Sequence, residues 1–147
     1  MRLRDPLPNL EKAVNFLNEK PVNPISTPSL VYFWSISCGD CKRRMPEIER
    51  IREEFHGRLQ LISIHMPLSK ADENVEEIER LSRKYKIQEP IIIDNDYYFS
   101  TIFGTKFVPS FYLFDGKGRL RHFQATKGLR PLMHRIKKLV LEAETAD

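Results

Sequence analysis

Both cysteines of the chain lie within four residues, in the sequence CGDC at positions 38–41. The run before them, 29–34, is apolar, partly β-branched and aromatic, and about one strand long. The apolar residues after them, from Met45 to Phe55, recur with helical spacing. The pair is therefore predicted at a strand-to-helix junction, where the unpaired N–H groups and the dipole of the helix favour negative charge. A Cys38 thiol in that place should ionise more readily than a free thiol, whose pKa is about 8.5.

The spacing of the two cysteines allows a reversible disulfide. Residues three apart on a helix have Cβ atoms about 5–6 Å apart, and a disulfide needs Cα atoms within about 4.4–6.8 Å, so Cys41 can reach Cys38. A metal site and a permanent structural disulfide are the alternatives. A tetrahedral zinc ion needs two more ligands, and the four histidines are scattered along the sequence without a spaced pair, so we expect no metal.

Composition and the N-terminal residues suggest where such a pair would work. The segment 1–8 carries charges and prolines where a secretory signal would be apolar, and no stretch approaches a membrane span. We therefore expect no membrane association and a cytoplasmic location, where thiols are kept reduced and a permanent disulfide is rare. The 147 residues suggest a single domain over 1–147. The net charge of +4 comes from interleaved acidic and basic residues, so we expect no nucleic-acid partner.

Strand and helix patterns alternate along the remaining chain. The segment 12–17 is compatible with either a short strand or a helical turn. The elements that follow are a strand at 29–35, a helix at 39–55, a strand at 59–64, a helix from Asp72 with Val75, Ile78, Leu81 and Tyr85 facing the core, a strand at 90–93, a short helix at 97–103, a hairpin at 108–123 and a last helix after Gly128. This order predicts an α/β fold with a mostly parallel central sheet, an antiparallel hairpin edge and helices on both faces. Sites in such sheets lie at the carboxyl ends of strands, where the CGDC segment falls.

With these features in place, the chain resembles thioredoxin-fold proteins. Phe33 and Trp34, followed by three residues and then the CxxC motif, resemble the thioredoxin signature. Pro46 matches the proline five residues after the second cysteine, and Val108-Pro109 resembles the family's cis-proline loop. The helix and strand inserted at about 72–93 resemble those of the TlpA/ResA branch. The resemblance implies a thioredoxin fold and a dithiol-disulfide reductase that needs no cofactor beyond its own redox-active disulfide.

The same resemblance assigns roles to individual residues. Cys38 would attack a substrate disulfide and Cys41 would resolve the mixed disulfide. Val108 and Pro109 would present backbone to an extended substrate, and Trp34 would shield the disulfide. Three further residues of the motif, Gly39, Asp40 and Lys42, would tune the thiol, with Lys42 favouring the thiolate and Asp40 opposing it. The implied partners are disulfide-containing proteins and a reductase that recharges the dithiol, and we expect a monomer.

The chain departs from the family pattern behind the disulfide. Thioredoxin's buried acid is replaced by Tyr32, the aromatic residue before the first cysteine is Ser37, and a glutamate found in some ResA-like proteins is Arg44. No residue is therefore assigned to accept the proton of Cys41. His65 follows a strand at the carboxyl edge of the sheet and could approach the site, but we expect it to be a surface loop histidine.

Two other functions remain open. Ser35 lies three residues before Cys38, as in the motif of thiol peroxidases. A non-catalytic binding module or a metal carrier is the other alternative. The aromatic residues Tyr97, Phe107 and Phe111 are expected to pack inside the protein rather than line a peptide groove.

Overall fold

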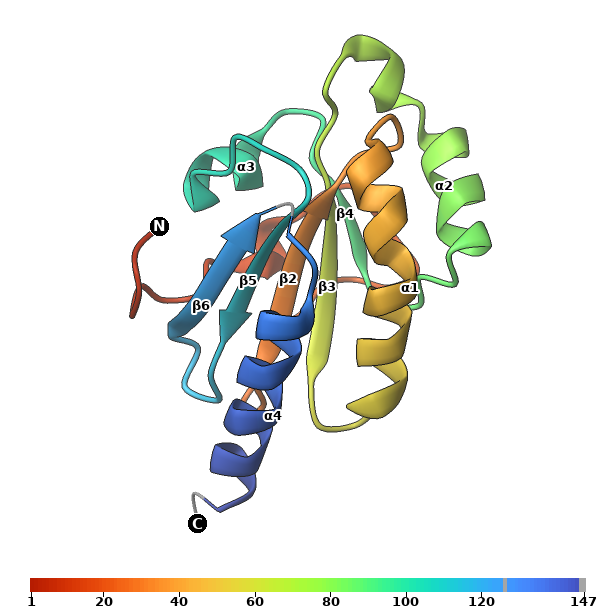
Figure 1. The fold of residues 1–147 in the computed structure, drawn as a ribbon. Coiled ribbons are helices and arrows are strands. Elements are labelled where there is room, and N and C mark those ends of the chain that lie inside the picture. Colours follow the sequence, from red (N-terminus) through yellow and green to blue (C-terminus); the bar gives the residue numbers. More distant parts are fainter. Residues whose placement is uncertain (126, 146–147) are drawn as a thin grey trace.

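A computed structural model describes residues 1–125 and 127–145 of the chain. Six strands form one sheet in the order β1-β4-β3-β2-β5-β6, with helices on both faces (Figure 1). The strands are β1 (Phe16–Leu17), β2 (Ser29–Trp34), β3 (Gln60–His65), β4 (Ile91–Ile93), β5 (Ser110–Phe114) and β6 (Leu120–Ala125). The helices are η1 (Leu10–Lys12), α1 (Gly39–Glu54), η2 (Lys70–Glu73), α2 (Val75–Lys84), α3 (Tyr98–Phe103) and α4 (Arg130–Glu144), where η marks 3-10 geometry.

The strand β2 lies in the middle of the sheet. Its six residues are all buried, in agreement with the continuous apolar run of a central strand. It pairs in parallel with β3 and antiparallel with β5, while β3 pairs in parallel with β4. The β5–β6 hairpin forms one antiparallel edge, so the predicted hairpin edge is confirmed. The sheet is mixed rather than mostly parallel, because only the β2–β3 and β3–β4 pairings are parallel and the other three are antiparallel.

Alternating residues of β2 divide the core into two layers. Leu30, Tyr32 and Trp34 pack with α1, α2 and α4 on one face. Val31 and Phe33 pack with α3 and the N-terminal segment on the other face. This two-sided burial holds the carboxyl end of β2, and with it the start of α1, in a fixed place.

Two local expectations need correction or completion. The helix expected from Asp72 begins at Val75, because the Asn74 side chain accepts the Glu77 N–H at 3.2 Å and caps the helix there. Val75, expected in the core stripe, stands at the first helical position and is 40% exposed. The undecided segment 12–17 contains both candidates: η1 ends at Lys12, and β1 pairs antiparallel with β4 as the second sheet edge.

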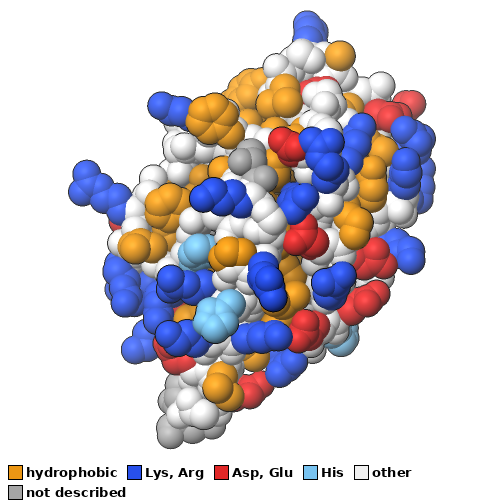
Figure 2. Space-filling model, viewed as in Figure 1, with side chains coloured by type: hydrophobic (Ala, Val, Ile, Leu, Met, Phe, Trp, Pro, Cys, Tyr) orange, Lys and Arg blue, Asp and Glu red, His pale blue; other side chains and the backbone are white. Residues whose placement is uncertain are grey.

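The surface of the described residues mixes charges of both signs. Figure 2 shows Lys and Arg side chains interleaved with Asp and Glu side chains over the face that carries α1 and α4. Among the described residues, no helix has the length and apolar character that crossing a membrane requires.

Candidate active site

Cys38 and Cys41 form a disulfide at the first turn of α1, with Cα atoms 5.3 Å apart. Cys38 is the N-cap residue of this helix, and its Sγ accepts the Cys41 N–H at 3.0 Å. The sulfur therefore takes the place of the serine or aspartate oxygen that usually caps a helix. A thiolate on Cys38 would receive the same N–H group and the favourable end of the helix dipole, as the strand-to-helix junction predicted.

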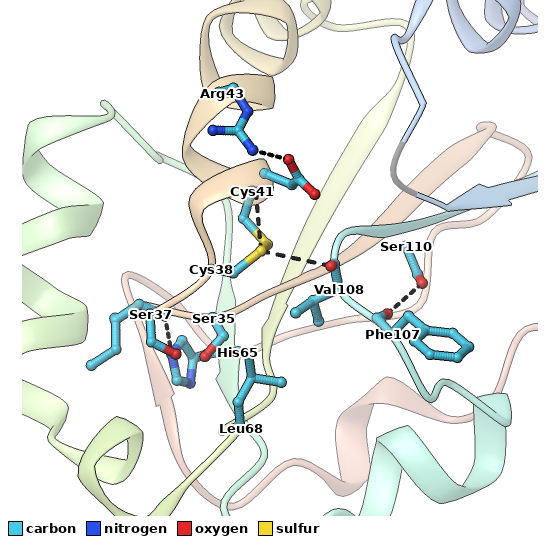
Figure 3. The surroundings of a disulfide bond; sticks show 12 residues. Ser35, Ser37, Cys38, Cys41, Arg43, His65, Leu68, Phe107, Val108 and Ser110 are labelled. Carbon is cyan, nitrogen blue, oxygen red and sulfur yellow. Dashed lines mark hydrogen bonds and ion pairs between the residues drawn. A yellow bond between two sulfur atoms is a disulfide. The ribbon is translucent and has the colours of Figure 1, made fainter.

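The two sulfurs differ in access. Cys38 is 8% exposed and Cys41 is 1% exposed, so the outer edge of the disulfide belongs to Cys38. On one side of it lies the loop before β5, in which the Val108-Pro109 peptide bond is cis, as the family resemblance implied. The Val108 carbonyl oxygen is 3.6 Å from Cys38 Sγ and faces it in Figure 3. An incoming disulfide at Cys38 would therefore lie against the Val108 backbone.

The residues between and just after the cysteines lie on the solvent side of α1. Asp40 is exposed and forms an ion pair with Arg43 one turn along the helix. Lys42 is half-buried and its charge acts on Glu77 of α2. A Cβ atom at Gly39 would meet only the flexible end of Arg43 at 3.7 Å, so the local space does not demand glycine.

Trp34 is buried in the core, with 1% of its surface exposed. Its indole Nε1 donates to Ser63 Oγ at 2.6 Å, and its ring edge meets His65 at a centroid distance of 5.1 Å. It belongs to the buried cluster that contains both cysteines. Shielding of the disulfide by Trp34, and contact between Trp34 and a substrate, stay predictions.

Tyr32, at the position of the missing acid, belongs to a buried polar network. Its hydroxyl donates to Glu89 Oε2 at 2.5 Å, and Arg52 of α1 donates to both oxygens of the same carboxylate at 2.7 and 2.8 Å. Burial, and then the Glu89 charge, raise the pKa of Tyr32 well above its ordinary value. Tyr32 therefore holds its proton at neutral pH and directs it toward Glu89.

Two aromatic side chains near the site differ from expectation. Phe107, expected to pack inside, is 68% exposed beside Val108. Tyr97 is also partly exposed, with its hydroxyl donating to the Pro67 carbonyl at 2.9 Å. Phe111 is fully buried, as expected. Leu68 is also exposed and is drawn below the disulfide in the view of Figure 3.

Comparison with known proteins decides the family. The thioredoxin family model matches residues 11–93. The chain is 34% identical over 148 residues to the thiol-disulfide oxidoreductase YkuV of Bacillus subtilis (strain 168), an alignment that covers 98% of this chain and 100% of YkuV. The chain belongs to the thioredoxin family.

Solved structures agree with this membership. A thioredoxin-like protein in its oxidised form superimposes with a TM-score of 0.83 at 35% identity, covering 97% of this chain and 99% of that one. A thiol-disulfide isomerase from Corynebacterium glutamicum superimposes with a TM-score of 0.80, covering 92% of this chain and 96% of that one; at 18% identity it shows the shared fold alone. With its CxxC disulfide, this thioredoxin-family protein is a thiol-disulfide oxidoreductase of the TlpA/ResA-like branch.

The thioredoxin-family site contains two buried groups that sequence reasoning missed. The expectation of a surface loop position for His65 is wrong: it ends β3, is fully buried, and its Nε2 accepts the Ile36 N–H at 3.1 Å. Asp72, taken as the start of a helix, is 3% exposed and accepts the hydroxyls of Ser35 and Ser37. The signal for His65 was its place at the carboxyl end of a parallel strand, the edge at which the disulfide lies.

His65 should make the stability of this thioredoxin-family protein depend on pH. Burial lowers the pKa of His65 to about 4, against an opposing effect of the Asp72 charge. As the pH falls below 6.5 the unfolded chain takes up this proton before the folded one does. The His65 contribution to the free energy of unfolding is therefore complete above pH 6.5 and is lost by about pH 4, a change of about 3 kcal/mol.

Denaturant titrations at several pH values test this expectation. His65→Gln offers an amide oxygen to the Ile36 N–H but does not titrate, so its unfolding free energy should fall less between pH 6.5 and 4. The pKa of Asp72 lies below its ordinary value of 3.8, because hydrogen bonds from Ser37, Leu68 and Ser35 outweigh the effect of burial. Its contribution is therefore lost only at lower pH than that of His65. Equal slopes for the two proteins between pH 6.5 and 4 would contradict the assignment to His65.

Proposed function

We propose that this protein is a cytoplasmic reductase of protein disulfides. The observation that carries the proposal is the placement of the disulfide: Cys38 caps α1 and is 8% exposed, whereas Cys41 is 1% exposed. A thiolate stabilised at a helix N-terminus is a working nucleophile, and a second thiol three residues away is in reach to resolve its adduct.

The reaction proceeds by two exchanges. The Cys38 thiolate attacks one sulfur of the substrate disulfide, forming a Cys38–substrate bond and releasing the other substrate sulfur as a thiolate. The Cys41 thiolate then attacks Cys38 Sγ, forming the disulfide seen in the structure and releasing the second substrate thiol. The protein is oxidised and the substrate reduced by two electrons. A separate dithiol reductase must return the two electrons, and the cytoplasm is the compartment where thiols are kept reduced.

The rim of the site suits an extended segment of a protein substrate. Val108 offers backbone next to Cys38, and Pro109 cannot donate to the sheet, so the Val108 backbone is available for a substrate strand to pair with. The exposed side chain of Phe107, the residue before Val108, adds apolar surface beside this backbone. No second subunit is needed to complete this arrangement, and we propose that the protein acts as a monomer.

The alternative peroxidase function lacks a supporting contact. In the structure the Ser35 hydroxyl donates to Asp72 at 2.8 Å rather than to Cys38. For the metal-carrier alternative, no group of three or more His, Cys, Asp or Glu side chains within residues 1–125 and 127–145 could hold a metal ion.

The test that separates a reductase from a peroxidase compares turnover of a protein disulfide, driven by excess dithiothreitol, with consumption of hydrogen peroxide. We expect disulfide reduction to dominate, and peroxide consumption at a comparable rate would overturn the proposal.

Asp40 offers a test of thiol tuning by charge. Asp40→Asn removes a negative charge close to Cys38 and frees the positive charge of Arg43. Both changes favour the thiolate, so the Cys38 pKa should fall and the couple should become more oxidising. Asp40 and Arg43 both face water, where two unit charges 4 Å apart interact by about 1 kcal/mol. The fall in the Cys38 pKa should therefore stay below about one unit.

The pH dependence of Cys38 alkylation by iodoacetamide measures this shift. Glu53→Gln is a matched control, because it neutralises an exposed carboxylate on the same helix about 20 Å away, beyond a Debye length of about 10 Å at 0.1 M salt. A Cys38 pKa that is unchanged in Asp40→Asn would remove Asp40 from the tuning of the thiol.

A further inference from the structure

The three residues before Cys38 are held by two buried groups that take no part in the exchange steps. The hydroxyls of Ser35 and Ser37 donate to Asp72 Oδ2 at 2.8 and 2.7 Å. Between them, the Ile36 N–H donates to His65 Nε2 at 3.1 Å. Each residue of the segment 35–37 thus has its own hydrogen bond to a group beneath the loop. Figure 3 shows Ser35, Ser37 and His65 together on the side of the loop that leads into Cys38.

Asp72 reaches this loop from a different part of the chain. It lies in η2, the short helix that follows β3 where the inserted segment of about 72–93 begins, and its Oδ2 also accepts the Leu68 N–H at 2.9 Å. Three donors on one oxygen stabilise the ionised carboxylate, so a buried negative charge is maintained there. The insertion that distinguishes this branch therefore supplies a group directly to the loop of the nucleophile.

His65 is the second acceptor for this loop. Because its Nε2 accepts the Ile36 N–H, the neutral ring carries its proton on Nδ1, which has no partner among the described residues. The ring is fixed by its place at the end of β3 and by its edge contact with Trp34. Its orientation therefore depends on the central strands β2 and β3.

The loop in turn sets the geometry at the sulfur. The Cys38 N–H donates to the Ser35 carbonyl at 3.1 Å, and Cys38 Sγ accepts the Cys41 N–H at 3.0 Å. A change in the path of residues 35–37 would move the Cys38 backbone relative to the first turn of α1. The sulfur would then lose its alignment with the N–H groups that stabilise a thiolate.

We propose that Asp72 and His65 are positioning residues that hold the 35–37 loop and thereby align Cys38 Sγ with the first turn of α1. The inference rests on the proposed exchange through Cys38, but the ionisation of Cys38 can be measured without any substrate. Asp72 has two opposed effects on Cys38. Its hydrogen bonds align the sulfur and favour the thiolate, whereas its negative charge disfavours the thiolate.

Two variants separate these effects. The double variant Ser35→Ala with Ser37→Ala removes two hydrogen bonds and keeps the Asp72 charge, so the Cys38 pKa should rise. Asp72→Asn removes the charge and keeps an acceptor oxygen for the serines, so the pKa should stay at the wild-type value or fall. Glu73→Gln, at an exposed carboxylate in the same short helix, is the matched control and should leave the pKa unchanged. All three leave Asp40, Arg43 and His65 in place.

The measurement is the rate of Cys38 alkylation in the reduced proteins as a function of pH. In the serine double variant, the midpoint of the profile should rise by about one pH unit, the size expected for loss of the single Cys41 N–H bond to the Cys38 sulfur, while the plateau at high pH stays at the wild-type rate. A general loss of structure would instead remove the protection of the thiols against alkylation at every pH. The Asp72→Asn protein would then show the same change.

The outcomes distinguish this inference from the proposed function. The positioning role would be overturned if the midpoint of the Cys38 alkylation profile stayed at its wild-type pH in both the serine double variant and Asp72→Asn, or if it rose equally in both. If wild-type protein fails to reduce protein disulfides but the serine variant still shifts the Cys38 profile, the proposed function fails and the positioning role stands.

Discussion

Replacing Cys38 with serine should reduce disulfide exchange to the rate measured without protein. The substitution removes the sulfur that caps α1 and lies at the exposed edge of the disulfide, and the remaining Cys41 is 1% exposed. A serine hydroxyl does not ionise near neutral pH and cannot form the mixed disulfide. Reduction of a protein disulfide, driven by excess dithiothreitol, measures the loss.

Replacing Cys41 with serine should give a different result. Cys38 can still attack, but no internal thiol is left to resolve the adduct, so the mixed disulfide should accumulate. Intact mass spectrometry under non-reducing conditions would show protein plus substrate for the Cys41 variant only. An adduct on the Cys38 variant, and none on the Cys41 variant, would mean that the roles of the two cysteines are reversed.

The substitution Arg52→Met should cause the largest loss of stability away from the cysteines. Arg52 and Glu89 are 11% and 6% exposed at their side chains, and Arg52 is bonded to both oxygens of the carboxylate. Removing the guanidinium leaves a buried charge that, among the described residues, keeps only the hydrogen bond from the Tyr32 hydroxyl. The expected cost is about 3–5 kcal/mol of unfolding free energy, because an uncompensated buried charge is left behind.

Two further variants test the cause of this loss. Arg80→Met is the matched control, because Arg80 also contacts both oxygens of a glutamate, Glu77, but the pair lies at the surface. The change in unfolding free energy caused by Arg80→Met should be no larger than the experimental error. Adding Glu89→Gln to Arg52→Met removes the unpaired charge and should restore part of the stability. Equal losses for Arg52→Met and Arg80→Met in urea denaturation would contradict the role of the buried pair.

The sequence predicted the part of the site that depends on local structure. The apolar run at 29–34 and the helical spacing after Cys41 were sufficient to place the cysteines at the start of α1, because both patterns lie within one strand and one helix. The Val108-Pro109 loop required the family resemblance, since nothing local specifies a cis bond.

The groups beneath the disulfide could not be predicted from local patterns. Asp72 follows Ser35 by 37 residues and Glu89 follows Tyr32 by 57, so these contacts exist only once β2, η2 and the start of β4 are assembled. Asp72 also appeared to be a helix start, a role that Asn74 takes in the structure. His65 was misplaced because the strand pattern does not show whether its last residue faces solvent or a neighbouring loop.

The reduction potential of the Cys38–Cys41 couple tests the central claim most directly. Equilibration with glutathione or dithiothreitol buffers, followed by quantification of the oxidised fraction, gives this value. A reductase that keeps protein disulfides reduced should have a potential near that of thioredoxin, about −270 mV. A value near −120 mV, as for a strong oxidant, would contradict a reductase and indicate that the protein forms disulfides in its substrates.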